Sequence, residues 1–264
     1  MNINRRGLIV SACALVLVAA VWIGGGEYEP RYNGRSLSEW LEIASTNRPE
    51  GMRALRQIGT NGLPYALKWI SNEPPAWRDK LYWSFYKVPT FIRPYWFMRF
   101  ISNERANRRA NLAPLIIRAT GADAVEIAQD LKRLTYRNSG GVAYNALDAF
   151  YFMGTNGFPQ LLEILNDPEN PYRGRAATIV GDIVEEHPSI GGLATPPLVK
   201  CLADTNDIVV MRASEAVVTR GVDVPSIIPF LVTNLGSTNS FIRGAATNAL
   251  KILAPQLLGN VAPR

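Results

Sequence analysis

Histidine and cysteine are almost absent from this chain, whose 264 residues include one histidine and two cysteines. Cys13 falls within an apolar run near the N-terminus, so the rest of the chain has a single cysteine, Cys201, and cannot form an internal disulfide. Cys201 follows the apolar spacing of a helix, and we expect it to be buried as a small apolar residue rather than exposed as a reactive thiol.

The single histidine, His187, follows Glu185 and Glu186, a combination that invites comparison with a metal site. Residues next to one another on a helix point in different directions, so this run does not place ligands on one face. We therefore expect no metal here, and we interpret His187 as a solvated helix end before Pro188.

Motifs for catalysis are missing as well. The sequence has no glycine-rich phosphate loop and no Cys-x-x-Cys pair, and no histidine other than His187 could activate a serine or cysteine nucleophile. Strand-like alternation bounded by hairpin turns is also absent, whereas hydrophobic residues make up 47% of the chain, enough for a packed core. We expect an all-α protein that is not an enzyme and uses no cofactor.

One long apolar run without charge occurs, and it lies at the N-terminus. Arg5 and Arg6 precede the uncharged residues 8–23, and Gly24-Gly25-Gly26 follows them. Two arginines before an apolar run are typical of an export signal and hold the N-terminus in the cytoplasm. With its glycines, the run approaches the ~30 Å thickness of the hydrocarbon core. We expect residues 1–26 to form an uncleaved, single-pass anchor in a bacterial cytoplasmic membrane, with all later residues outside the cytoplasm.

Two other fates of this segment stay open. Val18-Ala19-Ala20 is a tolerable signal-peptide cleavage site, which would leave a periplasmic or secreted protein. Val10-Ser11-Ala12-Cys13 looks like a bacterial lipobox, but the apolar run continues well beyond Cys13, so we interpret this cysteine as a small apolar residue in a membrane segment.

A six-residue phrase occurs twice, as Gly59-Thr60-Asn61-Gly62-Leu63-Pro64 and as Gly154-Thr155-Asn156-Gly157-Phe158-Pro159. The glycines suit the left-handed cap that ends one helix, and the proline suits the first turn of the next. Apolar residues then follow at the spacing of one helix face. The same pattern returns twice later, and the four sets are Leu63, Ala66, Leu67 and Ile70; Phe158, Leu161, Leu162 and Leu165; Leu198, Cys201 and Leu202; and Ile227, Phe230 and Leu231. The sequence therefore predicts a repeat array whose units stack into a solenoid.

A longer spacing rule indicates the type of repeat. Proline is followed at constant intervals by a turn residue and then by arginine in three units: Pro64, Asn72 and Arg78; Pro159, Asp167 and Arg173; Pro229, Ser237 and Arg243. This pattern resembles the HEAT repeat, in which a proline lies in the first helix, an Asp marks the turn and an Arg opens the second helix. The resemblance implies an α-α superhelix over about residues 36–258, with Asp and Arg side chains linking adjacent turns.

Two units depart from the HEAT pattern. The unit with Pro196, Asp204 and Arg212 has a two-residue insertion, and the unit at residues 111–131 has Pro114 but no arginine at the expected place. We interpret both as true repeats with irregular turns.

A basic aromatic insertion at about residues 77–109 interrupts the repeats. It contains eight basic residues opposed only by Asp79 and Glu104. We first expect its aromatic side chains to pack on neighbouring helices. A membrane or protein-partner surface is the main alternative. A nucleic-acid surface is a further alternative, but it suits an exported protein poorly. The candidate interaction residues are Trp83, Arg93, Trp96, Arg99, Arg105, Arg108 and Arg109.

The first helix of the array has its own signature. Ser36 and Glu39 form a capping box, and the helix that follows buries Leu37, Trp40 and Leu41. The run from Tyr32 to Leu41 resembles the start of the mature part of exported bacterial HEAT-repeat proteins, which follow a Tyr-x-Gly-basic-x-Leu-x-x-Trp-Leu pattern. We expect this helix to be the N-terminal cap of the array.

The chain is thus expected to comprise an anchor or signal peptide at 1–26, a linker at 27–35, a HEAT-like array at 36–258 and a frayed tail at 259–264. We predict a non-enzymatic scaffold that binds a protein partner, whose identity the sequence does not give, at the outer face of the membrane. The resemblance leaves two alternatives open, because HEAT-like arrays include nucleic-acid enzymes that excise alkylated bases and lyases that attach bilins. Both would work in the cytosol, which an export signal disfavours.

Overall fold

A computed structural model describes residues 28–73, 76–90, 93, 95, 98, 102–137, 139–218 and 222–260 of the chain. This part of the chain is mostly helical and has two very short strands, so the expected all-α class is confirmed. The expectations for residues 1–26, Cys13, Trp96 and Arg99 concern positions outside the described residues. Within the described residues, no helix combines the length and apolar character needed to cross a membrane.

The described elements follow one another in a simple order. They are β1 (Arg31–Tyr32), β2 (Arg35–Ser36), α2 (Leu37–Thr46), α3 (Arg48–Ile58), η1 (Gly59–Gly62), α4 (Leu63–Ile70), α5 (Ala76–Tyr86), α7 (Glu104–Leu112), α8 (Pro114–Thr120), η3 (Gly121–Ile127), α9 (Ala128–Leu134), α10 (Gly140–Met153), η4 (Gly154–Asn156), α11 (Phe158–Asn166), α12 (Arg173–Glu186), η5 (Pro188–Ile190), α13 (Gly191–Leu202), α14 (Asp207–Ala216), α15 (Val224–Asn234), α16 (Ser240–Leu253) and η6 (Pro255–Asn260).

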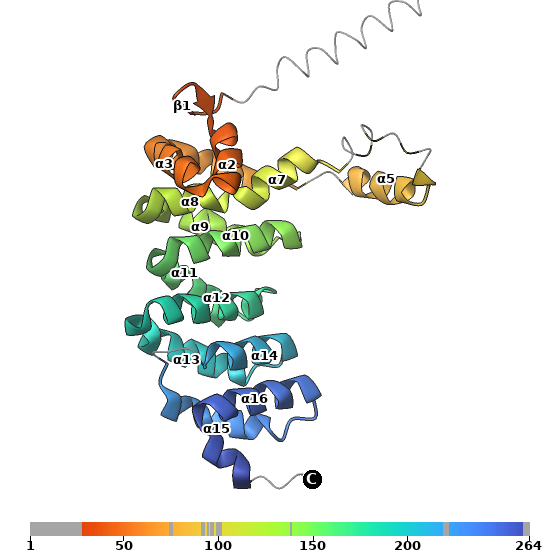
Figure 1. Cartoon of the computed structure of the whole chain (residues 1–264). Helices are drawn as coiled ribbons and strands as arrows, with labels where there is room; N and C mark the ends of the chain where they lie inside the picture. The colour runs from red at the N-terminus through yellow and green to blue at the C-terminus, as the bar shows by residue number, and fades with distance from the viewer. Residues whose placement is uncertain are drawn as a thin grey trace, which may run out of the picture.

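The helices from α8 onward pack in two layers. Helices α9, α11, α13 and α15 contact one another in sequence order, and so do α8, α10, α12, α14 and α16. Figure 1 shows the elements succeeding one another along one direction from the N-terminal to the C-terminal end. Each helix buries an apolar face between the layers, where Phe150, Leu161 and Val180 are fully buried.

The repeated phrase forms the same turn in both copies. Helix α3 ends at Gly59 with φ +58°, and α10 ends at Gly154 with φ +57°, a backbone region that side chains with a Cβ rarely adopt. Pro64 and Pro159 lie in the first turn of the next helix. The predicted order of helix, turn and helix is confirmed, with a short 3₁₀ segment in each turn.

The second glycine of the phrase has a different role from the first. A Cβ on Gly62 would lie 2.9 Å from Cγ2 of Ile116, and one on Gly157 would lie 2.9 Å from the carbonyl oxygen of Phe150. Both glycines have negative φ, so they are required by close packing rather than by backbone conformation.

Most of the predicted apolar positions are buried. The cores of α4, α11 and α13 include Leu63, Phe158 and Leu198, and the burial expected for Cys201 is confirmed. The helical phase was wrong for Phe230, which is 36% exposed while Ile227 and Leu231 in the same helix are buried. Leu67 and Leu162 are only partly buried, whereas Trp69 and Ile164 in the same helices are buried.

Residues 27–35 were expected to be a linker, but the described part of this segment, residues 28–35, is folded. Strands β1 and β2 pair antiparallel, and β1 contacts α3. Nε1 of Trp40 donates a 2.8 Å hydrogen bond to the carbonyl oxygen of Tyr32, which fastens this hairpin to α2. The predicted capping box of Ser36 and Glu39 is confirmed, with both reciprocal hydrogen bonds present.

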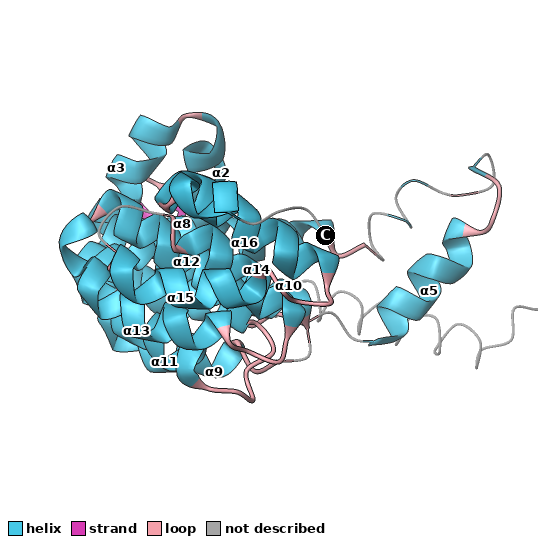
Figure 2. Ribbon diagram, turned by 90° about the horizontal axis from the view of Figure 1, so that it is seen from below, coloured by secondary structure: helices cyan, strands magenta, loops and turns pink. Residues whose placement is uncertain are grey.

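The basic aromatic insertion is shorter than expected at its C-terminal side. Helix α7, which contains Arg105, Arg108 and Arg109, packs against α2, α4 and α8 and therefore belongs to the packed body. Helix α5 lies to one side of the other helices in two perpendicular views (Figures 1 and 2).

Candidate functional site

Helix α7 brings three of the candidate arginines to one place. Arg105, Arg108 and Arg109 are spaced three and four residues apart, which places them on one side of the helix, and this side faces α2. Between the two helices lies an open cleft of ≈ 400 Å³. Its lining residues are Ser38, Glu39, Glu42, Glu104, Arg105, Arg108 and Arg109.

Arg108 is paired across this cleft. Its Nε lies 2.8 and 2.7 Å from the two carboxylate oxygens of Glu42, and its Nη2 lies 2.6 Å from Oε2. Both side chains are about half exposed, so water screens the pair and its contribution to stability is small, about 1 kcal/mol or less. Arg108 therefore joins α7 to α2 and is largely neutralised.

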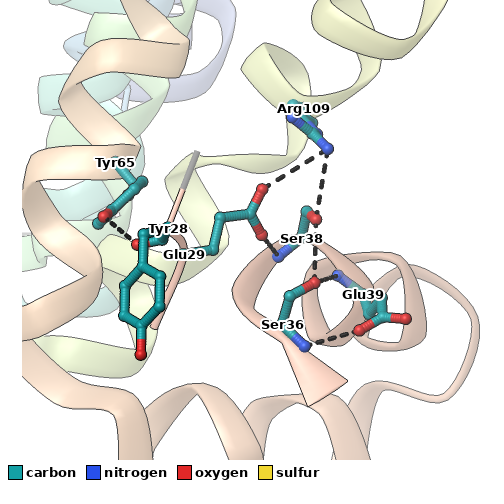
Figure 3. Close-up of polar contacts among 7 residues, drawn as sticks. All are labelled: Tyr28, Glu29, Ser36, Ser38, Glu39, Tyr65 and Arg109. Carbon is teal, nitrogen blue, oxygen red and sulfur yellow. Dashed lines mark hydrogen bonds and ion pairs between the residues drawn. The ribbon is translucent and has the colours of Figure 1, made fainter. Parts of the chain in front are cut away.

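Arg109 holds the N-terminal segment in place (Figure 3). Its Nη2 lies 3.6 Å from Oε1 of Glu29 and 3.4 Å from Oγ of Ser38, and its guanidinium stacks over Trp69 at 5.4 Å. The side chain of Glu29 is only 8% exposed, and its Oε2 accepts a 2.8 Å hydrogen bond from the backbone N–H of Ser38. Arg109 thus compensates a buried carboxylate, which makes its role in the cleft structural.

The charges of the cleft are therefore balanced. Glu39, Glu42 and Glu104 line it together with the three arginines, and Glu29 lies next to Arg109. The backbone N–H of Ser36 donates to Glu39, and this hydrogen bond, together with that from the Ser36 side chain, lowers the pKa of the Glu39 carboxyl. The cleft is thus a site of mixed charge, although residues 77–109 contain eight basic and two acidic residues.

Arg93, another candidate, caps helix α5. Its Nη2 donates a 2.6 Å hydrogen bond to the carbonyl oxygen of Tyr86, and its Nε donates to that of Val88. The guanidinium also lies 5.1 Å from the ring centre of Tyr86. A cation at this end of a helix satisfies its terminal carbonyls and complements the helix dipole.

Three of the five aromatic residues of α5 contradict the expectation that they pack on neighbouring helices. Trp77, Trp83 and Tyr86 are 51%, 61% and 53% exposed. The rings of Tyr82, Trp83 and Tyr86 contact one another, with centroids 5.8 to 6.1 Å apart. Their aromatic surface therefore faces solvent, and contiguous exposed apolar surface of this kind is typical of interaction sites.

The repeat-turn residues lie at the edge where paired helices connect. Arg173 opens α12, and its guanidinium forms a bidentate ion pair with Asp204, which includes a 3.2 Å contact between Nη2 and Oδ1. The two side chains are 12% and 11% exposed. Asp167 instead accepts a hydrogen bond from the hydroxyl of Tyr136, which lowers the pKa of the Asp167 carboxyl.

Arg243 bonds within its own turn rather than to a neighbouring turn. Arg243 donates to the carbonyl oxygens of Ser237 and Thr238 in its own turn, at 2.7 and 2.8 Å. Pro229 lies inside α15, and Arg78 lies in the first turn of α5 rather than at the start of a helix in the two-layer body.

Further contacts between consecutive turns were missed by the sequence analysis. Nδ2 of Asn170 donates a 2.8 Å hydrogen bond to Oγ1 of Thr135, and Nδ2 of Asn239 donates to Asp207. With the Arg173 ion pair, these contacts join the turns after α9, α11, α13 and α15 in succession, and the joined residues are 31 to 35 positions apart in the sequence. We call this series the turn ladder. Its sequence signature is an asparagine shortly before each helix start.

His187 and Cys201 occupy ordinary structural positions. His187 caps the C-terminus of α12 and is exposed, as expected. Among the described residues, no group of three His, Cys, Asp or Glu side chains is arranged to hold a metal ion. Burial raises the pKa of the Cys201 thiol to about 11, which suppresses its thiolate form at neutral pH.

Comparison of the chain with protein-family models, with curated proteins and with solved structures finds no match. The sequence and the geometry of the described residues are therefore the basis for the proposed function.

Proposed function

We propose that this protein is a non-enzymatic binding scaffold, built as a HEAT-like solenoid and held by its N-terminal run at the outer face of a bacterial cytoplasmic membrane. The turn ladder carries this proposal. Three contacts of similar placement join four consecutive turns. Each contact joins residues 31 to 35 positions apart, which is about the length of one helix pair. Such regularity supports stacked repeats, in which each unit contacts its neighbours and the array presents one extended surface.

The exposed apolar residues of the second layer fit a binding role. Ile208 and Phe241 are 62% and 72% exposed. The backbone N–H of Ile208 donates to Asn206, and that of Phe241 donates to Asn239, so each exposed residue lies two positions after a turn asparagine. Equivalent positions in neighbouring units therefore present apolar side chains along the same edge.

Location can be tested with reporters fused after Arg264. Alkaline phosphatase, which folds only outside the cytoplasm, should be active, and a cytoplasmic fluorescent reporter should be dark. The opposite pair of results would overturn the exported scaffold and revive the nucleic-acid and bilin-lyase alternatives, which a gel-shift assay and an incubation with bilin would then separate.

Binding can be tested with a photo-crosslinking amino acid in intact cells. Placed at Ile208 or Phe241, it should trap the same protein partner, because the two positions share an edge. Leu193, which is 63% exposed on α13 in the other layer, is the matched control and should trap that partner less. Equal crosslinking at all three positions would indicate random collisions and contradict a defined binding edge.

A further inference from the structure

Helix α5 presents an unusual combination of residues to solvent. Successive residues of a helix advance by about 100°, which places Lys80 and Ser84 together on one side and distributes the aromatic side chains, with Arg78 among them, around the remainder. Tryptophan and tyrosine side chains in folded proteins are normally buried over most of their surface. Yet Trp77, Trp83 and Tyr86 are each more than half exposed.

The types of exposed residue favour one kind of surface. Tryptophan and tyrosine have an apolar ring and a polar atom, and they concentrate at the headgroup level of membranes. Lys80 and Lys87 are exposed beside them, and long basic side chains extend toward anionic headgroups while their stems cover apolar surface. Arg93 donates to carbonyl oxygens at the end of α5, so it stabilises the helix while keeping its positive charge.

The chain geometry places α5 near a membrane if residues 8–23 are inserted in one. Four residues separate Ile23 from Tyr28, so the described part begins within about 18 Å of the end of the apolar run. Tyr28 is fixed to the folded body, because its carbonyl oxygen accepts a 2.6 Å hydrogen bond from the hydroxyl of Tyr65. Glu29 is held in turn by Ser38 and Arg109 (Figure 3). Figure 1 shows β1 and α5 at the same end of the molecule.

We propose that α5 lies in the headgroup layer of an anionic lipid bilayer and forms a second membrane contact beside the N-terminal run. This inference rests on the proposed membrane tether. The tether keeps α5 at a high effective concentration near the surface, so a weak interfacial interaction suffices. As a second point of attachment, the interaction orients the helical stack on the membrane.

The test uses the full chain reconstituted into vesicles of phosphatidylcholine mixed with phosphatidylglycerol. A fluorophore is attached to a cysteine introduced by Trp83→Cys, in a background with Cys13→Ala. Phe241→Cys is the matched control, because Phe241 is 72% exposed but lies at the other end of the stack. We expect nitroxide-labelled lipid headgroups to quench the label at position 83 and to leave the label at position 241 unquenched.

The lysines provide a quantitative arm. Each basic residue near an anionic surface contributes about 1 kcal/mol, which corresponds to about a fivefold change in an equilibrium constant. Lys80→Gln and Lys87→Gln should therefore each lower the ratio of membrane-bound to unbound α5 about fivefold, whereas Lys251→Gln on α16 should leave it unchanged. Vesicles of phosphatidylcholine alone should reproduce the loss caused by the two lysine variants together.

Three results separate the inference from its premise. If the full chain fails to float with vesicles, the tether itself is wrong and this inference falls with it. If the chain floats but the label at position 83 is no more quenched than that at position 241, the tether stands and the membrane contact of α5 is refuted. If the label at position 83 changes its emission without any quenching by lipid nitroxide, α5 contacts protein instead, which also overturns the proposal.

Discussion

The ion pair between Arg173 and Asp204 is a bidentate and little-exposed link between neighbouring helix pairs. Both nitrogens of the guanidinium end face both oxygens of the carboxylate, and the side chains are 12% and 11% exposed. Oδ1 of Asp204 also accepts a 2.8 Å hydrogen bond from the backbone N–H of Asn206. The pair therefore links one turn to the next and also fixes the geometry of the second turn.

Removing one member should be costly. Arg173→Met would leave the Asp204 carboxylate in a little-exposed site with one backbone N–H as its remaining partner. Breaking a buried pair in this way costs about 3–5 kcal/mol, and the slight exposure here favours the lower end, about 3 kcal/mol. For a chain of this size, that loss corresponds to a fall of about 6–12 °C in the unfolding midpoint.

Replacing both members should cost less than the sum of the two single replacements. Asp204→Asn keeps an oxygen for the N–H of Asn206 and removes the charge that Arg173→Met leaves unpaired. We expect a coupling free energy of at least about 1 kcal/mol between the two substitutions, measured as a double-mutant cycle from thermal unfolding followed by circular dichroism.

The control is an exposed ion pair of similar chemistry. Arg133 and Asp130 are paired at 2.8 Å on one helix face, with the arginine side chain 80% exposed. Arg133→Met should change the free energy of unfolding by no more than about 0.5 kcal/mol. Equal midpoints for Arg133→Met and Arg173→Met would refute the idea that the turn ladder holds neighbouring helix pairs together.

Three further changes test other parts of the fold. Leu161→Ala should destabilise by about 2–5 kcal/mol in chemical denaturation, and Leu162→Ala by clearly less, because Leu161 is fully buried and Leu162 only partly so; similar losses would contradict the observed helix phase. Gly154→Ala should cost about 1–3 kcal/mol because of its positive φ, whereas Gly141→Ala in α10, where an added Cβ meets nothing within 4 Å, should be neutral or stabilising. With its pKa raised to about 11, the Cys201 thiol should be about one part in a thousand thiolate at pH 8. Peptide mass spectrometry should therefore find Cys201 alkylated by iodoacetamide only after the protein is unfolded. Rapid alkylation in the native state would show that the thiol is accessible.

The turns of the repeated phrase were predictable because each glycine leaves a local signature. Gly59 and Gly154 end their helices with positive φ, and that requirement is visible in the sequence as glycine before a new apolar period. Gly121 ends α8 with φ +69° in the same kind of turn. Here Ala122-Asp123-Ala124 replaces the rest of the phrase, so this turn could not be recognised from the repeated residues. Backbone conformation is thus repeated more faithfully than the residues that carry it.

The interaction surface was less predictable, because a charge count does not contain the partners of each charge. The sequence shows Arg108 and Arg109 in a basic stretch, whereas their partners Glu42 and Glu29 lie far away in the chain. Pairing across such distances depends on tertiary packing. The exposure of Trp83 could not be predicted from the sequence either, because an aromatic residue on a helix is consistent with both a core and an interface.

The two ways in which helices are held in register explain where an insertion can occur. From α9 onward, consecutive turns are joined by the turn ladder, so a long insertion there would displace the residues that make it. Between α4 and α7 the chain instead leaves the stack to form α5, and α7 is held by Arg108 with Glu42 and by Arg109 with Glu29. These ion pairs arise from the body of α7 and not from its turn, so they keep it docked whatever lies between it and α4. The helical stack can therefore carry an exposed aromatic helix near its N-terminal end without losing the register of the helix pairs that follow.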